Sequence, residues 1–171
     1  MHLCPEQSEE TLDQAEHARN AAMERLRNAR NELSAAEENL RAADANFEKV
    51  RRAEAAKTPV DRSALQLSGG GPVTEDHREI DPKSGQQKGY VVLTPAERAK
   101  GFTRPYRDAY RHLKCGKITT MSREIAETYA RDPGFYNGTF CATCRAHFPV
   151  GEDGEFTWYE MDGREGPKVG T

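Results

Sequence analysis

Residues 112–116 read His-Leu-Lys-Cys-Gly and residues 141–144 read Cys-Ala-Thr-Cys, and these stretches decide the fold of the C-terminal part. Within each stretch, a two-residue gap lets both ligand atoms turn onto one metal ion, and two such pairs complete a tetrahedron. Gly116 suits the tight turn in which backbone amides point at a thiolate. The sequence therefore predicts a closed, structural Zn²⁺ site held by His112, Cys115, Cys141 and Cys144.

Other interpretations of these residues stay open at the level of sequence. His147 follows Cys144 closely and could replace His112 as the fourth ligand, although the knuckle spacing favours His112. Cys141 and Cys144 could form a disulfide or a redox pair, but the thioredoxin-like surroundings of such a pair are absent. The four residues could also be unrelated side chains. Cys4 stands alone and is expected to be a free thiol.

A zinc-dependent deaminase is the enzyme class to weigh, because residues 77–79 read His-Arg-Glu upstream of a C-x-x-C pair. In those enzymes the triplet begins a buried helix, and a proline precedes the first cysteine. Here the triplet falls in a charged, irregular segment, and Phe140 precedes Cys141. No nucleotide-binding glycine loop, nucleophile elbow or pair of carboxylates is evident, so we expect a non-enzymatic protein.

The chain of 171 residues is 36% hydrophobic and 31% charged, which makes it too polar for one large core. By composition it divides into residues 8–57, 58–88 and 89–171. No segment approaches the roughly 18 apolar residues of a membrane span, and no signal peptide is evident at the N-terminus. We therefore expect an intracellular protein, in which clustered cysteines stay reduced and bind metal.

Residues 8–57 contain no glycine or proline, which predicts one long helix that ends before Thr58-Pro59. Ser8 and the acids after it suit the helix start. A heptad with 3-4 spacing puts a narrow apolar stripe on one face, as in a coiled coil, with one break at Arg19. The seam residues are Leu12, Ala15, Ala22, Leu26, Ala29, Leu33, Ala36, Leu40, Ala43, Phe47 and Val50. The stripe needs a partner helix, and its alanines favour close, antiparallel packing.

Residues 58–88 are rich in Gly, Pro, Ser and Gln and predict a flexible linker. From residue 89 onward the aromatic residues gather. We expect strands over 90–93, 148–150, 155–160 and near Val169, and helices after Thr94, over 105–112 and over 120–131. The predicted fold class is α+β, with a long N-terminal coiled-coil helix, a flexible linker and a small zinc-ribbon-like C-terminal domain.

Basic and aromatic residues alternate between residues 98 and 117, opposed by a single acid, Asp108. Lys and Arg neutralise phosphates, and aromatic faces stack on unpaired bases. The candidate nucleic-acid-binding residues are Arg98, Lys100, Arg104, Tyr106, Arg107, Tyr110, Arg111, Lys114 and Lys117. The alternative is a solvated basic face whose aromatic residues belong to the core.

Four runs in this part of the chain resemble a family of bacteriophage and prophage proteins that has no established activity. They are residues 119–121, 125–133, 140–144 and 147–150. The resemblance extends over roughly residues 110–150 and the terminal hairpin, and the long helix lies outside it. It implies a viral origin and a location in the host bacterial cytoplasm, and it implies no mechanism.

The sequence leaves two hypotheses about function. In the first, the chain is a phage-derived zinc-binding interaction module, whose helix assembles copies or captures a host or phage protein and whose zinc domain is the docking surface. In the second, it is a nucleic-acid-binding accessory protein that uses the basic and aromatic stretch. We expect no membrane as a partner.

Overall fold

The computed structural model describes residues 5–160 and 162–171, with side chains from Thr11 onward. Cys4, the expected free thiol, lies outside the described residues, as does the side chain of Ser8. The chain divides after Glu48 into two units, of which the second spans Lys49–Thr171. Within the described residues, no helix is both long and apolar enough to cross a membrane.

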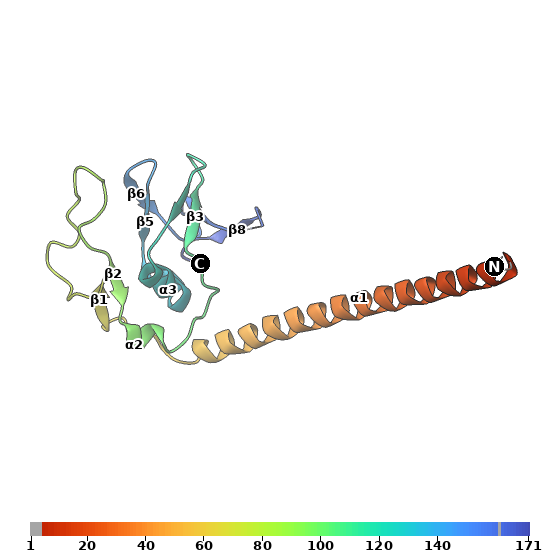
Figure 1. Ribbon diagram of the computed structural model, residues 1–171. Coiled ribbons are helices and arrows are strands. Elements are labelled where there is room, and N and C mark those ends of the chain that lie inside the picture. Colours follow the sequence, from red (N-terminus) through yellow and green to blue (C-terminus); the bar gives the residue numbers. More distant parts are fainter. Residues whose placement is uncertain (1–4, 161) are drawn as a thin grey trace. The chain divides into compact units, whose positions relative to one another are not determined.

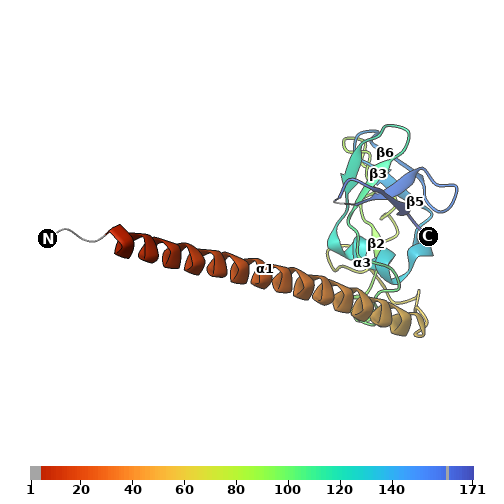
Figure 2. The same ribbon diagram turned by 90° about the vertical axis from the view of Figure 1, so that its right-hand side faces the viewer.

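The first element is α1, a single helix of 52 residues from Pro5 to Ala56 (Figure 1, Figure 2). It begins earlier than the expected Ser8 and ends where predicted, before Thr58-Pro59. The large side chains of the predicted seam are all exposed, with values between 58% and 67%. Within the described residues, these large side chains of the apolar stripe are therefore uncovered.

The last turn of α1 is held by a buried arginine of the second unit. The Nη1 atom of Arg131 donates a hydrogen bond to the carbonyl of Ala55 at 3.0 Å, and its Nη2 donates to the carbonyl of Thr58 at 2.9 Å. Carbonyls at the end of a helix lack partners within the helix, and the Ala55 carbonyl is bonded here by both Arg131 and the N–H of Thr58. Its charge is balanced by Glu97, whose carboxylate lies 3.2 Å away and is equally buried.

The second unit is built from short strands and two short helices. Four strands form an antiparallel sheet in the order β4-β3-β7-β8, while β1 pairs with β2 and β5 pairs with β6 in separate two-stranded sheets (Figure 1). The elements are β1 (Leu65–Leu67), β2 (Val91–Leu93), α2 (Pro95–Arg98), β3 (Ala109–His112), β4 (Ile118–Thr120), α3 (Arg123–Arg131), a 3₁₀ turn (Pro133–Phe135), β5 (Gly138–Cys141), β6 (Ala146–Pro149), β7 (Phe156–Tyr159) and β8 (Glu165–Lys168).

The core of this unit is aromatic. Tyr129 of α3 meets Trp158 of β7 edge to face, with 5.4 Å between the ring centroids. Tyr110 of β3 packs against Trp158 and Phe156 in the same edge-on manner. Edge-to-face contacts place the positive ring edge on the negative face, which adds to the benefit of burial. The α+β class is confirmed, and most of the predicted strands and the helix over 120–131 appear close to their expected positions.

The prediction of a helix over residues 105–112 is wrong, because this stretch contains β3. Tyr110 and His112 are buried while Arg111 between them is half-buried, which is the period-two pattern of a strand. Pairing with both β4 and β7 satisfies the backbone of this segment. Tyr110 is buried as part of this strand, whereas Tyr106 precedes it and is exposed.

Residues 58–88 differ from the flexible linker that the composition predicts. Leu67 pairs with Val91 in the β1–β2 sheet, and Ile80 forms an isolated bridge with Gln87. Gly85 lies so close to the carbonyl of Arg145 that a Cβ atom there would be only 2.2 Å from the oxygen. A few backbone pairings and close approaches order a segment whose polar composition gives no periodic signal.

A candidate metal centre

The two predicted ligand pairs come from two hairpins of different sheets. His112 ends β3 and Cys115 lies in the turn to β4, whereas Cys141 ends β5 and Cys144 lies in the turn to β6. The ligand atoms of all four residues lie within 4.8 Å of one another. The Sγ atoms of Cys115 and Cys141 are 3.7 Å apart, and Cys144 Sγ is 3.5 Å from His112 Nδ1. The structure thus brings together the four residues chosen from sequence.

Both hairpins turn in the same way around this cluster. Gly116, directly after Cys115, has a φ of 70°, and its N–H donates to the carbonyl of His112 at 2.7 Å. Arg145, directly after Cys144, has a φ of 53°, and its N–H donates to the carbonyl of Cys141 at 2.8 Å. Each turn therefore closes over its own ligand pair, and both use a left-handed residue to do so.

The imidazole of His112 is fixed from three sides. Its ring stacks against Phe148, at 4.5 Å, and against Phe156, at 4.8 Å, and only 1% of the residue is exposed. Its Nε2 atom lies 3.0 Å from Oε2 of Glu155. The other carboxylate oxygen of Glu155, Oε1, accepts a hydrogen bond from Lys114. With Nε2–H donated to a carboxylate, Nδ1 is left with its lone pair facing the sulfur atoms.

The pKa values of Cys115 and Cys144 are shifted in opposite directions. A hydrogen bond from the backbone N–H of Lys117 lowers the pKa of Cys115 to about 7, and hydrogen bonds from the other cluster residues add to this decrease. Desolvation, together with the hydrogen bonds and charges of Cys141 and Cys115, raises the pKa of Cys144 to about 12. The backbone N–H near Cys115 thus favours the thiolate form of that residue, whereas burial and the neighbouring sulfur atoms disfavour the thiolate form of Cys144.

The chemistry and spacing of these donors fit a tetrahedral zinc ion. Ligand atoms bound to zinc at 2.0–2.3 Å in a tetrahedron lie about 3.6–3.8 Å from one another. The distances from Cys115 Sγ to Cys141 Sγ and from Cys144 Sγ to His112 Nδ1 are close to this value. A disulfide needs sulfur atoms about 2.05 Å apart, so Cys115, Cys141 and Cys144 are free thiols here. The three thiols and one imidazole nitrogen would supply all four ligands of such an ion.

His147, the alternative ligand, lies outside the cluster. Its Nε2 atom is 3.0 Å from the hydroxyl of Tyr90, and burial lowers the pKa of its imidazole. The deaminase-like triplet is also elsewhere. The ring of His77 contacts the carbonyl of Thr74, and Glu79 forms an ion pair with Lys88.

The basic residues of the stretch 98–117 are placed mostly against acids of the same unit. Arg98 is 9% exposed and forms an ion pair with Glu127 at 2.8 Å. Lys100, Arg107 and Lys114 form ion pairs with Glu97, Glu160 and Glu155, respectively. Arg111 lies over the ring of Tyr159, 5.8 Å from its centroid, and Lys117 is exposed. Much of the positive charge is therefore balanced locally.

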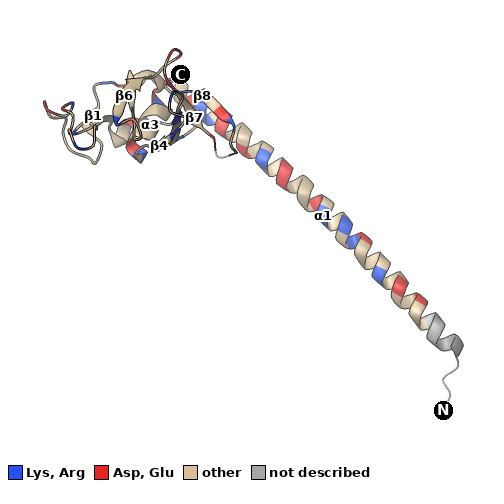
Figure 3. Ribbon diagram, turned by 90° about the horizontal axis from the view of Figure 1, so that it is seen from above, with Lys and Arg blue, Asp and Glu red and all other residues tan. Residues whose placement is uncertain are grey.

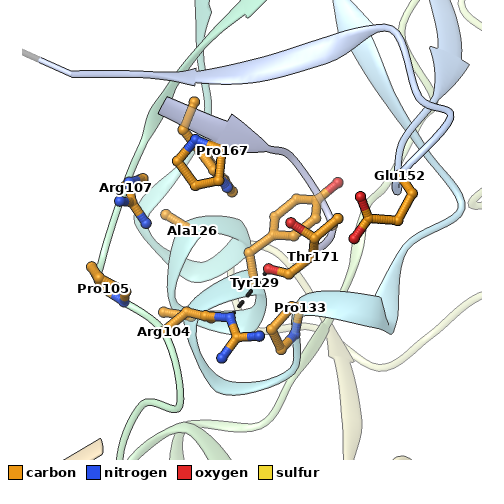
Figure 4. A pocket seen from close by; sticks show the side chains of 12 residues that line it. Arg104, Pro105, Arg107, Ala126, Tyr129, Pro133, Glu152, Pro167 and Thr171 are labelled. Carbon is orange, nitrogen blue, oxygen red and sulfur yellow. Dashed lines mark hydrogen bonds between the residues drawn. The ribbon is translucent and has the colours of Figure 1, made fainter. Parts of the chain in front are cut away.

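The aromatic residues of that stretch do not form one surface. Tyr110 is 2% exposed and donates its hydroxyl to the carbonyl of Phe140 at 2.6 Å, so it belongs to the core. Tyr106 is 44% exposed. Arg104 and Arg107 line a cavity of about 280 Å³ instead, where Arg104 donates to the carbonyl of Thr171 (Figure 4).

Two residues of the metal centre were not found by reasoning from sequence. Glu155 lies far from His112 in the sequence, directly before β7. No sequence motif connects an acidic residue there with the histidine. Arg145 occupies a turn position that favours glycine, so composition hides the similarity of the two turns. The signal that could have revealed the role of Arg145 is its position directly after Cys144, which matches the position of Gly116 directly after Cys115.

No family model, no curated protein and no solved structure matches this chain.

Proposed function

We propose that His112, Cys115, Cys141 and Cys144 hold one structural Zn²⁺, and that the chain is a zinc-stabilised interaction module. The observation that carries the metal assignment is the cluster of four donor atoms within 4.8 Å, supplied by two turns of matching geometry. A Cys₃His set leaves no position for a substrate or water, which suits a structural ion. The fold would be zinc-ribbon-like in this local sense.

The ion would join two sheets that share no strand. The β3–β4 hairpin and the β5–β6 hairpin belong to separate sheets. The described hydrogen bonds between them include that from Tyr110 to the carbonyl of Phe140 and that from the Ala142 N–H to Thr119 Oγ1. Four coordinate bonds would add a strong link between the hairpins, since structural zinc contributes about 10–16 kcal/mol to small domains.

The interaction role rests on α1. Its exposed seam needs a second helix, and a rigid zinc-bound unit on the same chain would present a docking surface to a host or phage protein. The bacteriophage resemblance would place this activity in the cytoplasm of a bacterial host. The nucleic-acid alternative has less support, because most of its basic residues are paired with acids and Tyr110 is buried.

Removal of the metal from the full chain tests this proposal. Trp158 is the single tryptophan, and its neighbour Phe156 stacks on His112. A chelator under reducing conditions should release zinc and shift the emission of Trp158 to longer wavelength, while the far-ultraviolet helical signal of α1 remains. An unchanged emission, with no metal released, would overturn the structural role of the site.

A further inference from the structure

The seam of α1 has a regular alternation of large and small side chains. Its large members are Leu12, Leu26, Leu33, Leu40, Phe47 and Val50, with exposures between 58% and 67%. Alanine occupies every intervening position from Ala15 to Ala43, and Arg19 stands at one large position. Six exposed large side chains in one line make a surface that has to be covered.

We propose that this surface is covered by a second copy of the same helix, running antiparallel and reversed about Asn31. The proposal rests on the proposed function and names the partner of the helix. In this register the whole seam from Leu12 to Val50 is used, because reversal about Asn31 exchanges its two ends. The facing pairs, one residue from each copy, are Leu12–Val50, Ala15–Phe47, Arg19–Ala43, Ala22–Leu40, Leu26–Ala36 and Ala29–Leu33.

Side-chain volume favours the reversed register. Each layer between the two Leu12–Val50 ends then joins one long side chain to one alanine, so these layers have similar volumes and the helices keep a short separation. A parallel pair in register would stack leucine on leucine and alanine on alanine. The leucine layers would hold the backbones apart and leave voids at the alanines, and voids of this kind are costly.

The charges along the helix disfavour the parallel alternative (Figure 3). In a parallel pair, Arg19 would face its own copy in the seam, whereas the reversed register sets it against Ala43 and lets its stem lie over a small residue. The residues that flank a parallel seam would also meet with like charge, Arg25 against Arg30 and Glu32 against Glu37 of the other copy. In the reversed register, residues 25–30 of one copy lie beside residues 32–37 of the other copy.

Disulfide trapping in the full, zinc-loaded chain tests this register. The double variant Leu26→Cys, Ala36→Cys is prepared with Cys4→Ser, oxidised gently with glutathione disulfide, and mapped by mass spectrometry. We expect links between positions 26 and 36 of different copies. Asn31→Cys, on the outer face of the same helix, is the matched control and should give no rapid link within the dimer. Light scattering should report a mass of two chains before oxidation.

Other outcomes separate the inference from the proposal beneath it. Links of 26 to 26 and 36 to 36 would overturn the antiparallel register while self-association stands. A monomeric mass for the wild-type chain would overturn the second copy as occupant, and zinc content measured on the same sample would show that the metal site is a separate matter. Leu33→Glu should yield monomers that keep their zinc, whereas a Leu33→Glu chain with a dimeric mass would overturn this seam.

Discussion

Gly116 and Arg145 occupy equivalent positions in the two turns that surround the metal centre. Each follows the second ligand of its pair, each has a positive φ, and each donates its N–H to the carbonyl of the first ligand. Among the residues that the structure describes, Arg145 is the one non-glycine residue with this backbone conformation. The two turns therefore need the same left-handed backbone conformation but use different residues for it. This conformation costs more free energy at Arg145 than at Gly116, because arginine has a Cβ atom.

Substitutions at these two positions should change stability in opposite directions. A Cβ atom at position 116 would contact nothing within 4 Å, so Gly116→Ala should lose about 1–2 kcal/mol through the left-handed conformation alone. Arg145→Gly should relieve the same strain and gain up to about 1 kcal/mol, after the extra freedom of glycine in the unfolded chain. Urea unfolding of the zinc-bound protein, followed by Trp158 emission, measures both. Equal losses in the two variants would contradict the equivalence.

Removal of Arg131 should be among the most destabilising changes in the second unit. Arg131→Met leaves Glu97 buried with only Lys100 as an ion-pair partner, and it removes one hydrogen bond each from the carbonyls of Ala55 and Thr58. Breaking a buried ion pair from one side costs about 3–5 kcal/mol. The matched control is Arg123→Ala, which removes an exposed ion pair of the same helix and should have little effect. A small loss for Arg131→Met in urea unfolding would contradict this role.

Glu155 should act through His112 rather than through the metal itself. Glu155→Gln weakens the acceptor that holds Nε2–H of His112, and we expect zinc affinity to fall by about 10- to 100-fold, measured by competition with a chromogenic chelator. Lys114→Ala removes the second partner of the same carboxylate and should change the affinity much less. Equal affinity for Glu155→Gln and wild type would remove Glu155 from the support of the site.

Two buried tyrosines should respond differently to loss of the hydroxyl. The hydroxyl of Tyr110 donates to Phe140, so Tyr110→Phe should lose about 1 kcal/mol. The hydroxyl of Tyr129 is buried and forms no hydrogen bond with any residue that the structure describes, while the Thr139 hydroxyl donates to Tyr110. Tyr129→Phe should therefore leave the free energy of unfolding unchanged or raise it slightly. A clear loss for Tyr129→Phe would show that its hydroxyl is satisfied.

The sequence predicted those features that depend on local spacing. The long helix follows from a segment without glycine or proline, and the cluster of His112, Cys115, Cys141 and Cys144 follows from two pairs with fixed gaps. The paired strands β7 and β8 lie close to the strands expected over 155–160 and near Val169. The strand β3 was missed because its burial pattern needs both β4 and β7 as neighbours, which no local window contains.

The order in residues 58–88 was missed for a related reason. It depends on pairing with β2 and on the approach of Gly85 to Arg145, and both contacts join residues far apart in the sequence. Thr94 and Glu97 have the spacing of a capping box, but the Thr94 side chain caps no amide and the Thr94 N–H donates to the carbonyl of Ala64. Glu97 turns away from the Thr94 amide to meet Arg131 and Lys100, so a tertiary ion pair overrides a local hydrogen bond.

The most direct test of the account is the zinc content of the chain. Elemental analysis is made on protein purified under reducing conditions without a metal-binding tag, for wild type, Cys141→Ser, His112→Ala and His147→Ala. The account predicts about one zinc per chain for wild type and for His147→Ala, loss of zinc in Cys141→Ser, and loss or severe weakening in His112→Ala. Wild-type protein without zinc, or Cys141→Ser with its zinc retained, would contradict the central claim.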